Sequence, residues 1–495
     1  MVILVLATQL LHSTPPPPTC TTKIDTTAVR AGDDYQCTPL PSPNTLATCR
    51  AACCASSRCV SFSFNEPWSL NVSYMGCVSG ENCCCLKSSV PPLEPNKWPM
   101  KITTGVASRP PVPFSCTSNL DCMLNGECET KTSTCTCDTG WRDDDCGELA
   151  LVPMATIAGA YEHPVKDIKT DCSISCGPSS WGGLPLRGPN GKYHLFASQF
   201  VNNCTLAGWN PGSQVVRAVS DLPEGPYVYA ETVFPTFHHN PTVRRLTPEQ
   251  SGIGAEMYLM LMIGDDTAPP AESGAKCAYD AGKDPHHLEG YISLASAPTL
   301  LGPWTVLSHA VLPPGDTNDW DAMVTNPAPF IFPNGTALLY YRGTKWPIDG
   351  LERIGVAKST HGWRGPYGRV GEGKPLWGNG SDSDDRRAYV EDPSVWQDTK
   401  RGNFHMLSHG HWDENGYYAC AEHAEGPWRF RIKHSYTNVI AMEDGTSTTM
   451  VQRERPQLWF NETTGEPALL FTGVAPPGSK FYGYTYTLAQ RVQQK

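Results

Sequence analysis

The amino-acid sequence predicts a mainly β protein, a five-bladed β-propeller preceded by small disulfide-rich modules. Glycine and proline number 44 and 45 in 495 residues, while charged residues make up only 18%. This composition favours many short strands joined by turns. Sixteen of the 21 cysteines precede residue 147, and this density is typical of small secreted domains held by disulfides. From residue 150 onward one strand pattern recurs five times, as a propeller requires.

The first residues have the features of a secretory signal. The apolar run VILVLATQLL at residues 2–11 is too short to span a bilayer and is followed by HSTPPPP, so residues 1–19 are predicted to be a signal peptide. No other segment is apolar over eighteen residues, and we expect no membrane span. The protein is therefore predicted to be secreted, extracellular or at the cell surface. Five N-x-S/T triplets fit a glycoprotein, and they begin at Asn71, Asn203, Asn334, Asn379 and Asn461.

Residues 20–90 are predicted to form a cysteine-rich module. They contain ten cysteines, in stretches such as CRAACCASSRCVSFSF and GCVSGENCCCLKS, and a domain this small needs disulfides because it buries little apolar surface. The pattern resembles the PAN/apple-like modules of secreted eukaryotic proteins, which implies an extracellular protein or carbohydrate as partner. A disulfide-held spacer without a ligand is the alternative. Residues 91–115 are proline-rich and are predicted to be a linker.

A second cysteine module is predicted at residues 116–148. Its spacing is C-x5-C-x5-C-x6-C-x-C-x8-C, with Gly140 and Trp141 after the C-x-C. This pattern resembles an EGF-like domain. The resemblance implies first-to-third, second-to-fourth and fifth-to-sixth pairing. It also implies no bound calcium, because acidic residues are missing before the first cysteine, and Asp143 to Asp145 are expected to form a solvated turn. The implied disulfides are Cys116–Cys128, Cys122–Cys135 and Cys137–Cys146.

The repeat covers residues 150–490. Each unit begins an apolar strand with a proline, continues through a polar turn, and returns in a second apolar strand. In the first four units a third strand follows and a Gly-Pro-aromatic triplet closes the unit, whereas the fifth unit lacks this ending. The combination of x-Asp-Pro, A-x-S and Gly-Pro-Trp/Tyr resembles the five-bladed propellers of glycoside hydrolase families 43 and 32. The repeat prolines are Pro185, Pro241, Pro327, Pro393 and Pro456.

Propeller geometry predicts where a site would lie. The first strand of each blade begins, and the second ends, at the face where ligands bind, so residues before each repeat proline and after each second strand should converge. Glycosidic cleavage needs two carboxyl groups, and the catalytic candidates are Asp392, Glu391, Asp321 and Glu454. Candidates for substrate binding, as hydrogen-bonding groups or as an aromatic platform, are Trp181, His239, Asn240, Asn326, Arg342, His409, His411 and Arg455.

Glu391 and Asp392 are neighbours on a predicted strand, so their side chains should point to opposite faces, and they are expected not to form the catalytic pair together. Asp392 is the only carboxylate directly before a repeat proline, so we expect it to face the axis. We also expect Asp392→Asn to leave the melting temperature within a few degrees. In the resembled family the first blade supplies an aspartate as general base before its proline, whereas Leu184 precedes Pro185 here.

The predicted function follows from these observations. A net charge of −11 argues against nucleic acid or an anionic membrane as partner. The resemblance implies a glycoside hydrolase acting on an extracellular or cell-wall polysaccharide. The alternative is a non-catalytic glycan-binding or adhesion protein that has lost the first-blade base. No cofactor and no metal are expected. Expected partners are a carbohydrate, and an extracellular protein through the two cysteine modules.

Overall fold

The computed structural model divides the chain into two compact units, Met1–Pro113 and Phe114–Lys495. In the first unit the structure describes residues 21–25, 28–29, 34–38, 45–55, 59, 61–65, 83–87, 94–95 and 102–108. In the second unit it describes residues 114–161, 179–264, 291–345, 351–377, 389–411 and 413–494. The predicted signal peptide lies outside the described residues. Within them, no helix has the length and apolar character needed to cross a membrane.

In its described residues the first unit has a five-stranded sheet, a two-stranded sheet and one helix, tied together by disulfides. Helix α1 covers Leu46–Ala55, and Cys49–Cys84 links it to the sheet while Cys53–Cys59 closes its end. The sheet has the order β1 (Thr21–Asp25), β7 (Ile102–Ser108), β4 (Ser61–Asn65), β5 (Cys83–Lys87), β3 (Asp34–Thr38), and β2 (Ala28–Val29) pairs with β6 (Glu94–Pro95). Strand β7 lies within the predicted linker, where the β-branched run ITTGV favours a strand.

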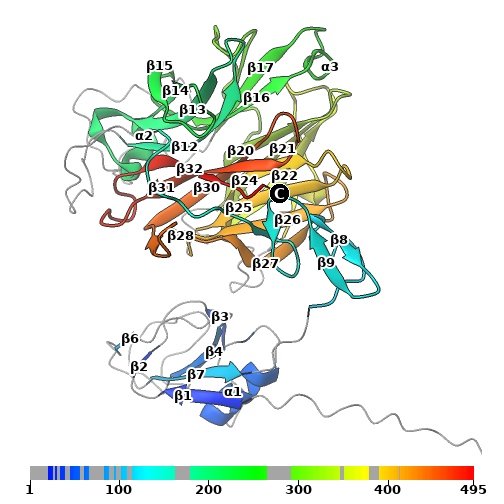
Figure 1. Ribbon diagram of the computed structural model, residues 1–495. Coiled ribbons are helices and arrows are strands. Elements are labelled where there is room, and N and C mark those ends of the chain that lie inside the picture. Colours follow the sequence, from blue (N-terminus) through cyan, green and yellow to red (C-terminus); the bar gives the residue numbers. More distant parts are fainter. Residues whose placement is uncertain are drawn as a thin grey trace, which may run out of the picture. The chain divides into compact units, whose positions relative to one another are not determined.

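The second unit begins with a small module of two hairpins, shown in cyan in Figure 1. Strand β8 (Gly126–Glu129) pairs with β9 (Thr134–Cys137), and β10 (Trp141–Arg142) pairs with β11 (Glu148–Leu149). Its disulfides join the pairs that the resemblance implies, Cys116–Cys128, Cys122–Cys135 and Cys137–Cys146.

Five sheets follow, four of four strands and one of three. Blade 1 contains β12 (Ser180–Arg187), β13 (Tyr193–Phe200), β14 (Ser213–Ser220) and β15 (Val228–Phe234). Blade 2 contains β16 (His238–Leu246), β17 (Met257–Gly264), β18 (Ile292–Ala297) and β19 (Thr305–Ser308). Blade 3 contains β20 (Met323–Ile331), β21 (Ala337–Thr344), β22 (Glu352–Ser359) and β23 (Gly368–Arg369). Blade 4 contains β24 (Val390–Gln397), β25 (Phe404–Gly410), β26 (Gly416–Ala421) and β27 (Arg429–Tyr436), and blade 5 contains β30 (Gln452–Phe460), β31 (Pro467–Ala475) and β32 (Tyr486–Arg491).

The five sheets form a closed ring, which confirms the predicted propeller (Figure 1). The inner strands β12, β16, β20, β24 and β30 pack on one another in order, and β30 packs on β12. A separate apolar cluster fills each gap between neighbouring blades. The other described elements are short and include the hairpin of β28 (Val439–Ala441) and β29 (Ser447–Thr449), the helices α2 (Trp209–Gly212) and α3 (Pro248–Ser251), and single turns of 3-10 helix.

Two features of the ring differ from the predicted three-strand repeat. The first four blades have a fourth, outer strand after the Gly-Pro-aromatic triplet. Few residues of β15, β19 and β23 are buried, so these three strands leave little apolar signal in the sequence. Blade 5 lacks such a strand of its own. Residues 150–161 run beside β32 instead: Leu151 bridges Val492, Tyr161 bridges Thr487, and the amide of Val152 donates to the carbonyl of Arg491 at 2.9 Å. Residues that precede the first repeat thus complete the last blade.

The small module packs on blade 4 through a buried seam. The rings of Trp141 and Trp396 stack with centroids 6.5 Å apart, and the hydroxyl of Tyr418 donates to the carbonyl of Met123. Arg431 is 4% exposed, and its Nε donates to Asp145 Oδ2 at 2.9 Å. Its guanidinium also pairs with Asp143. The expected solvated turn at Asp143 to Asp145 is therefore wrong, because two of its three carboxylates bind a buried arginine.

Candidate functional site

The residue before the proline has the same unusual backbone in four blades. Asn240, Asn326, Asp392 and Arg455 have φ values between 49° and 53°, in the left-handed region that asparagine and aspartate tolerate best. At each of them the pairing of the inner strand with the second strand shifts, which is the mark of a β-bulge. These bulges aim side chains at one end of the propeller axis.

The bulge corrects the alignment of the first blade. Register is lost between Trp181 and Leu184, so Gly182, with φ 61°, occupies the position that asparagine, aspartate or arginine holds in the other blades. Leu184 precedes a proline but is not the equivalent residue, because Pro185 lies beyond the bulge. A glycine fits this position because it adopts positive φ without steric cost. The first blade thus contributes no side chain here.

The bulge also overturns the expected separation of Glu391 and Asp392. Oε1 of Glu391 lies 3.3 Å from Nε2 of His409, and Oδ2 of Asp392 lies 3.5 Å from Nδ1 of the same ring. Alternation of side chains assumes a regular strand, whereas the left-handed backbone at Asp392 breaks it. Both neighbouring carboxyls therefore contact one buried histidine.

Arg455 crosses the axis and ties three blades together. Its Nη1 donates to Asp392 Oδ1 of blade 4 at 2.7 Å, and its Nη2 donates to the carbonyl of Asn240 of blade 2 at 2.8 Å. A Cβ at Gly182 of blade 1 would lie 2.5 Å from Cδ of Arg455. The missing side chain of blade 1 therefore makes room for an arginine from blade 5.

Glu391 is the most connected carboxylate of the site. Its Oε2 accepts from Nη1 of Arg342 at 2.6 Å and from Nδ2 of Asn326 at 3.0 Å, and its Oε1 lies 3.1 Å from Nδ1 of His411. Burial by itself would raise the pKa of Glu391, but Arg342 and the histidines outweigh it and hold the pKa well below its usual range. Glu391 is therefore ionised.

Glu454 is the second ionised carboxylate. Its Oε1 accepts from Nε2 of Gln452 at 2.6 Å, and its Oε2 lies 3.4 Å from Nε2 of His409. Burial opposes ionisation, but His409 lowers the pKa of Glu454 below its usual value. Despite full burial, the pKa of His409 is raised by Glu454 and Glu391, so a histidine cation lies between two carboxylates.

Sequence reasoning missed two carboxyl groups of this site, Glu352 and Glu414. Glu352 begins β22, and Glu414 lies in the turn between β25 and β26; they are 7% and 6% exposed. Burial, together with Glu454, raises the pKa of Glu414 to about 11, and burial raises that of Glu352. The position of these two residues in the repeat is the signal that could have found them. The turn between the second and third strands of a blade lies at the same end of the blade as the repeat proline.

We call the resulting group the axial cluster. It combines five carboxyl groups, two guanidinium groups and two imidazoles, contributed by blades 3, 4 and 5. Its members with guanidinium or imidazole side chains are Arg342, Arg455, His409 and His411, and those with carboxyl side chains are Glu352, Glu391, Asp392, Glu414 and Glu454.

Three predicted site residues have other surroundings. Asp321 accepts from the Tyr341 hydroxyl at 2.7 Å and pairs with Arg369 of the outer strand β23 at 2.6 Å, so it joins strands within blade 3. Trp181 is 2% exposed and belongs to an apolar cluster, where it gives no open platform for a sugar.

His239 makes its direct contacts outside the axial cluster, although after burial it is Arg455 and Glu391 of the cluster that act on its pKa. Its Nδ1 is 2.8 Å from the Ser213 hydroxyl, and its ring packs on Trp209. Asn240 and Asn326, by contrast, lie at the edge of the axial cluster, and Asn326 contacts it through Glu391.

The axial cluster could hold a divalent cation. In each of the groups Glu352, Glu391, His411 and Glu391, His409, Glu454, the potential ligand atoms lie within 4.8 Å of one another. Carboxylate and imidazole ligands suit manganese or zinc.

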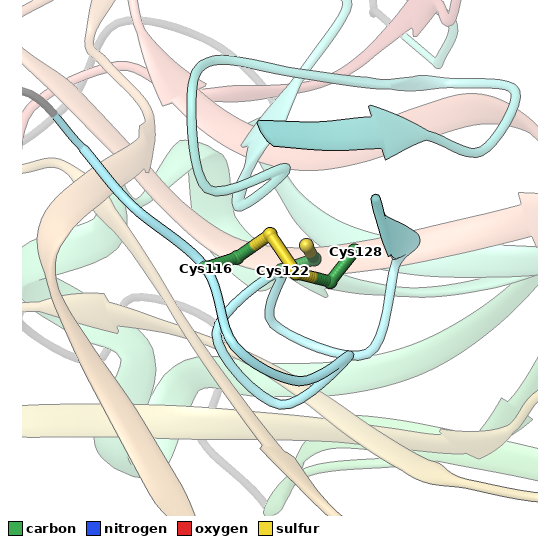
Figure 2. Close-up of side chains that lie close together, drawn as sticks. All are labelled: Cys116, Cys122 and Cys128. Carbon is green, nitrogen blue, oxygen red and sulfur yellow. A yellow bond between two sulfur atoms is a disulfide. The ribbon is translucent and has the colours of Figure 1, made fainter. Parts of the chain in front are cut away.

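A third group with metal-like spacing, Cys116, Cys122 and Cys128, is excluded as a metal site. All three sulfurs are in disulfides and offer no thiolate, as the Cys116–Cys128 bond in Figure 2 illustrates.

Chemically, the axial cluster offers carboxyls in both protonation states. Glu391 and Glu454 can accept a proton, and Glu414 holds one. Environments that push the pKa values of neighbouring carboxyls apart are the usual means of setting acid and base roles at a catalytic site.

Comparisons with known proteins concern the fold. No family model and no curated protein matches the chain. A family 117 glycoside hydrolase from the marine bacterium Zobellia galactanivorans is 12% identical with a TM-score of 0.46, over 69% of this chain and 91% of that one. The catalytic domain of a family 62 α-L-arabinofuranosidase from Coprinopsis cinerea is 11% identical with a TM-score of 0.44, over 69% and 98%. A family 43 enzyme from Xanthomonas citri, in complex with xylose, is 12% identical with a TM-score of 0.42, over 68% and 90%.

Proposed function

We propose that the protein is a secreted glycoside hydrolase that acts on an extracellular or cell-wall polysaccharide through the axial cluster. Its catalytic carboxyls come from blades 4 and 5, and none comes from blade 1. Glu391 and Glu454 act as the ionised groups, base or nucleophile, and Glu414 supplies the proton for the leaving oxygen.

One observation carries this proposal. Among the described residues, the axial end of the propeller gathers six buried side-chain atoms that make neither a hydrogen bond nor an ion pair. They are both carboxyl oxygens of Glu414, Oδ1 of Asn240, Nε of Arg342, Oγ1 of Thr325 and Nε of Arg455. Buried polar groups are nearly always hydrogen-bonded, so such a concentration indicates a polar ligand. A ligand rich in hydroxyl groups satisfies donors and acceptors together.

A second candidate function is glycan binding without hydrolysis. Gly182 leaves the first blade without a carboxyl, and the ion pair between Asp392 and Arg455 occupies both groups at the axis. A binding protein needs the polar atoms without partners to hold a glycan. It does not need neighbouring carboxyls with different pKa values, which serve acid and base roles. The two functions therefore differ in one measurable property, the release of reducing ends.

The test uses the full chain, secreted from a eukaryotic host, and a panel of plant, algal and animal polysaccharides. Hydrolysis should release reducing sugar from at least one polysaccharide. Glu391→Gln and Glu454→Gln should each lower the rate by about a hundredfold or more, while the exposed Glu443→Gln serves as a matched control. Binding of a polysaccharide in affinity electrophoresis, with no release of reducing ends, would favour the second candidate. Neither binding nor release across the panel would contradict both.

The cysteine modules complete this proposal. We propose that residues 20–90 form a PAN/apple-like module and residues 116–148 an EGF-like domain, and that they serve targeting on an extracellular surface. The five described disulfides support a route through an oxidising compartment.

A further inference from the structure

We propose that Phe481 and Tyr482 form a binding platform for a neutral pyranose ring at the rim of the axial cluster. This inference rests on the proposed function, because it adds a subsite and a class of sugar to the same site. Phe481 stacks on the apolar C–H face of the ring, and the hydroxyl of Tyr482 binds one of the ring hydroxyls.

The first argument is where the two side chains lie. They belong to the turn between β31 and β32, the second and third strands of blade 5, so they stand at the axial end of the propeller. Phe481 is 46% exposed. It contacts Tyr482 edge to face, with ring centroids 4.6 Å apart and planes inclined by 78°. An aromatic ring that keeps so much surface open beside a polar site is suited to cover the apolar face of a sugar.

The second argument is a direct link between this turn and a catalytic candidate. The amide of Tyr482 donates to Oε1 of Gln452 at 2.6 Å, and Nε2 of the same side chain donates to Oε1 of Glu454 at 2.6 Å. Burial raises the pKa of Tyr482, and the carboxylates of Glu454 and Glu391 raise it further, as expected for a hydroxyl close to the axial cluster. A sugar on the platform therefore adjoins the carboxyls that the proposed reaction uses.

The third argument is that the platform is held in place by blade 1. The carbonyl of Tyr482 accepts from the amide of Ala207 at 2.9 Å and from the hydroxyl of Thr205 at 3.0 Å. The ring of Tyr482 packs on the apolar cluster that contains Trp181 and Leu206. These contacts maintain a φ of 57° at Tyr482, a left-handed backbone that is uncommon for a bulky residue. Strain of this kind persists where the surroundings enforce it and is concentrated at ligand sites.

The Tyr482 hydroxyl is the polar half of the platform. The side chain is half-buried, and the described hydrogen bonds of this residue use its amide and its carbonyl, not its hydroxyl. A phenolic O–H can both donate and accept. It is therefore available to a sugar hydroxyl.

The fourth argument identifies the class of sugar. The ionised groups of the axial cluster already pair with one another, so an ionic sugar has to compete with existing pairs. A neutral ring needs only an apolar surface, which Phe481 supplies, and a hydrogen-bonding partner, which Tyr482 supplies. The pairs are Arg342–Glu391, Arg455–Asp392 and His409–Glu454.

Calorimetry on the full chain tests the platform. The probes are neutral hexasaccharides of β-linked xylose, glucose and galactose, and at least one of them should bind. Phe481→Ala should weaken that binding by about tenfold, through the loss of stacking on one ring. Tyr482→Phe should weaken it by about threefold to tenfold, through the loss of one hydrogen bond. Phe481→Trp keeps an aromatic face, so it should bind within about threefold of the unaltered chain and change its fluorescence when the sugar binds.

A matched control separates stacking from general effects on the surface. Tyr229 is 45% exposed on the outer strand β15, so Tyr229→Ala removes a similar ring away from the axial end and should leave the affinity unchanged. Melting temperatures identify a variant that fails to fold, and the fluorescence change of Phe481→Trp does not depend on the alanine variant.

The outcomes distinguish the platform from the proposed hydrolase. Equal affinity of Phe481→Ala and the control overturns the inference, and release of reducing ends by both chains would then leave the proposed function standing. Failure of the unaltered chain to bind any of the hexasaccharides also overturns the inference. Weakened binding by Phe481→Ala, with no release of reducing ends by the unaltered chain, would contradict the hydrolase and support the platform.

Discussion

Replacing Arg431 by methionine tests whether the small module at residues 114–149 and the propeller form one structural unit. The guanidinium is 3% exposed and donates to Asp145 at 2.8 and 2.9 Å, with Asp143 as a second partner. Gly147 packs directly against this side chain, since a Cβ there would lie 2.2 Å from Cδ of Arg431. The change therefore removes a buried cation from the seam: Asp145 loses its guanidinium partner, and Asp143 keeps only Lys433 among its described ion pairs.

The expected magnitude follows from burial. Breaking a buried ion pair by removing one partner costs about 3–5 kcal/mol. We expect the lower end, about 3 kcal/mol, because Asp143 and Asp145 are 26% and 14% exposed and water can reach them after the change. A cost of this size increases the population of the open state, in which the small module is detached from blade 4, by about a hundredfold.

Hydrogen exchange measures this opening directly. In the full chain, amide protons of β10 and β11 should exchange about a hundredfold faster in Arg431→Met, while those of β20 in blade 3 should keep their rates. Arg187→Met is the matched control, because its ion pair with Glu462 is exposed on both sides and contributes little. Equal protection of β10 in the Arg431 variant and the control would refute the view that this arginine holds module and propeller together.

Three further results are expected. Asp392→Asn should lower the melting temperature by roughly 4–6 °C in a thermal scan, at the upper end of the few degrees expected from sequence, because it deprives the buried guanidinium of Arg455 of its carboxylate at a cost of about 3–5 kcal/mol; a shift under about 2 °C would contradict this. Burial lowers the pKa of His411, but its contacts with Glu391 and Glu352 outweigh burial and raise the pKa to about 9. The stability that the protonated ring contributes is therefore complete below the unfolded pKa of about 6.5 and is lost as the pH rises toward 9. Urea unfolding should show stability falling by up to about 3 kcal/mol over that interval, and His411→Gln should flatten the fall. Tyr161→Ala should cost about 3–5 kcal/mol in urea unfolding, because this buried ring completes blade 5; the exposed Tyr229→Ala should cost under about 1 kcal/mol, and equal costs would argue against this closure.

The architecture is predictable from the sequence because its signals are local and repeated. A proline, two apolar strands and a polar turn recur five times, and each copy predicts the same arrangement of strands. The cysteine spacing at residues 116–146 likewise contains enough local information to imply the pairs that the structure forms. The repeat prolines also marked the end of the blades where the carboxyls gather.

Only the tertiary structure decided which side chains meet. Bulges break the alternation of strand side chains, so Glu391 and Asp392 reach one histidine and Gly182, not Leu184, stands at the first-blade position. Glu414 belongs to the site through a turn with no motif of its own. Arg455 joins blades that lie more than two hundred residues apart in the chain. Residues 150–161 complete blade 5 because the ring must close, and ring closure depends on contacts between distant segments that no local pattern encodes.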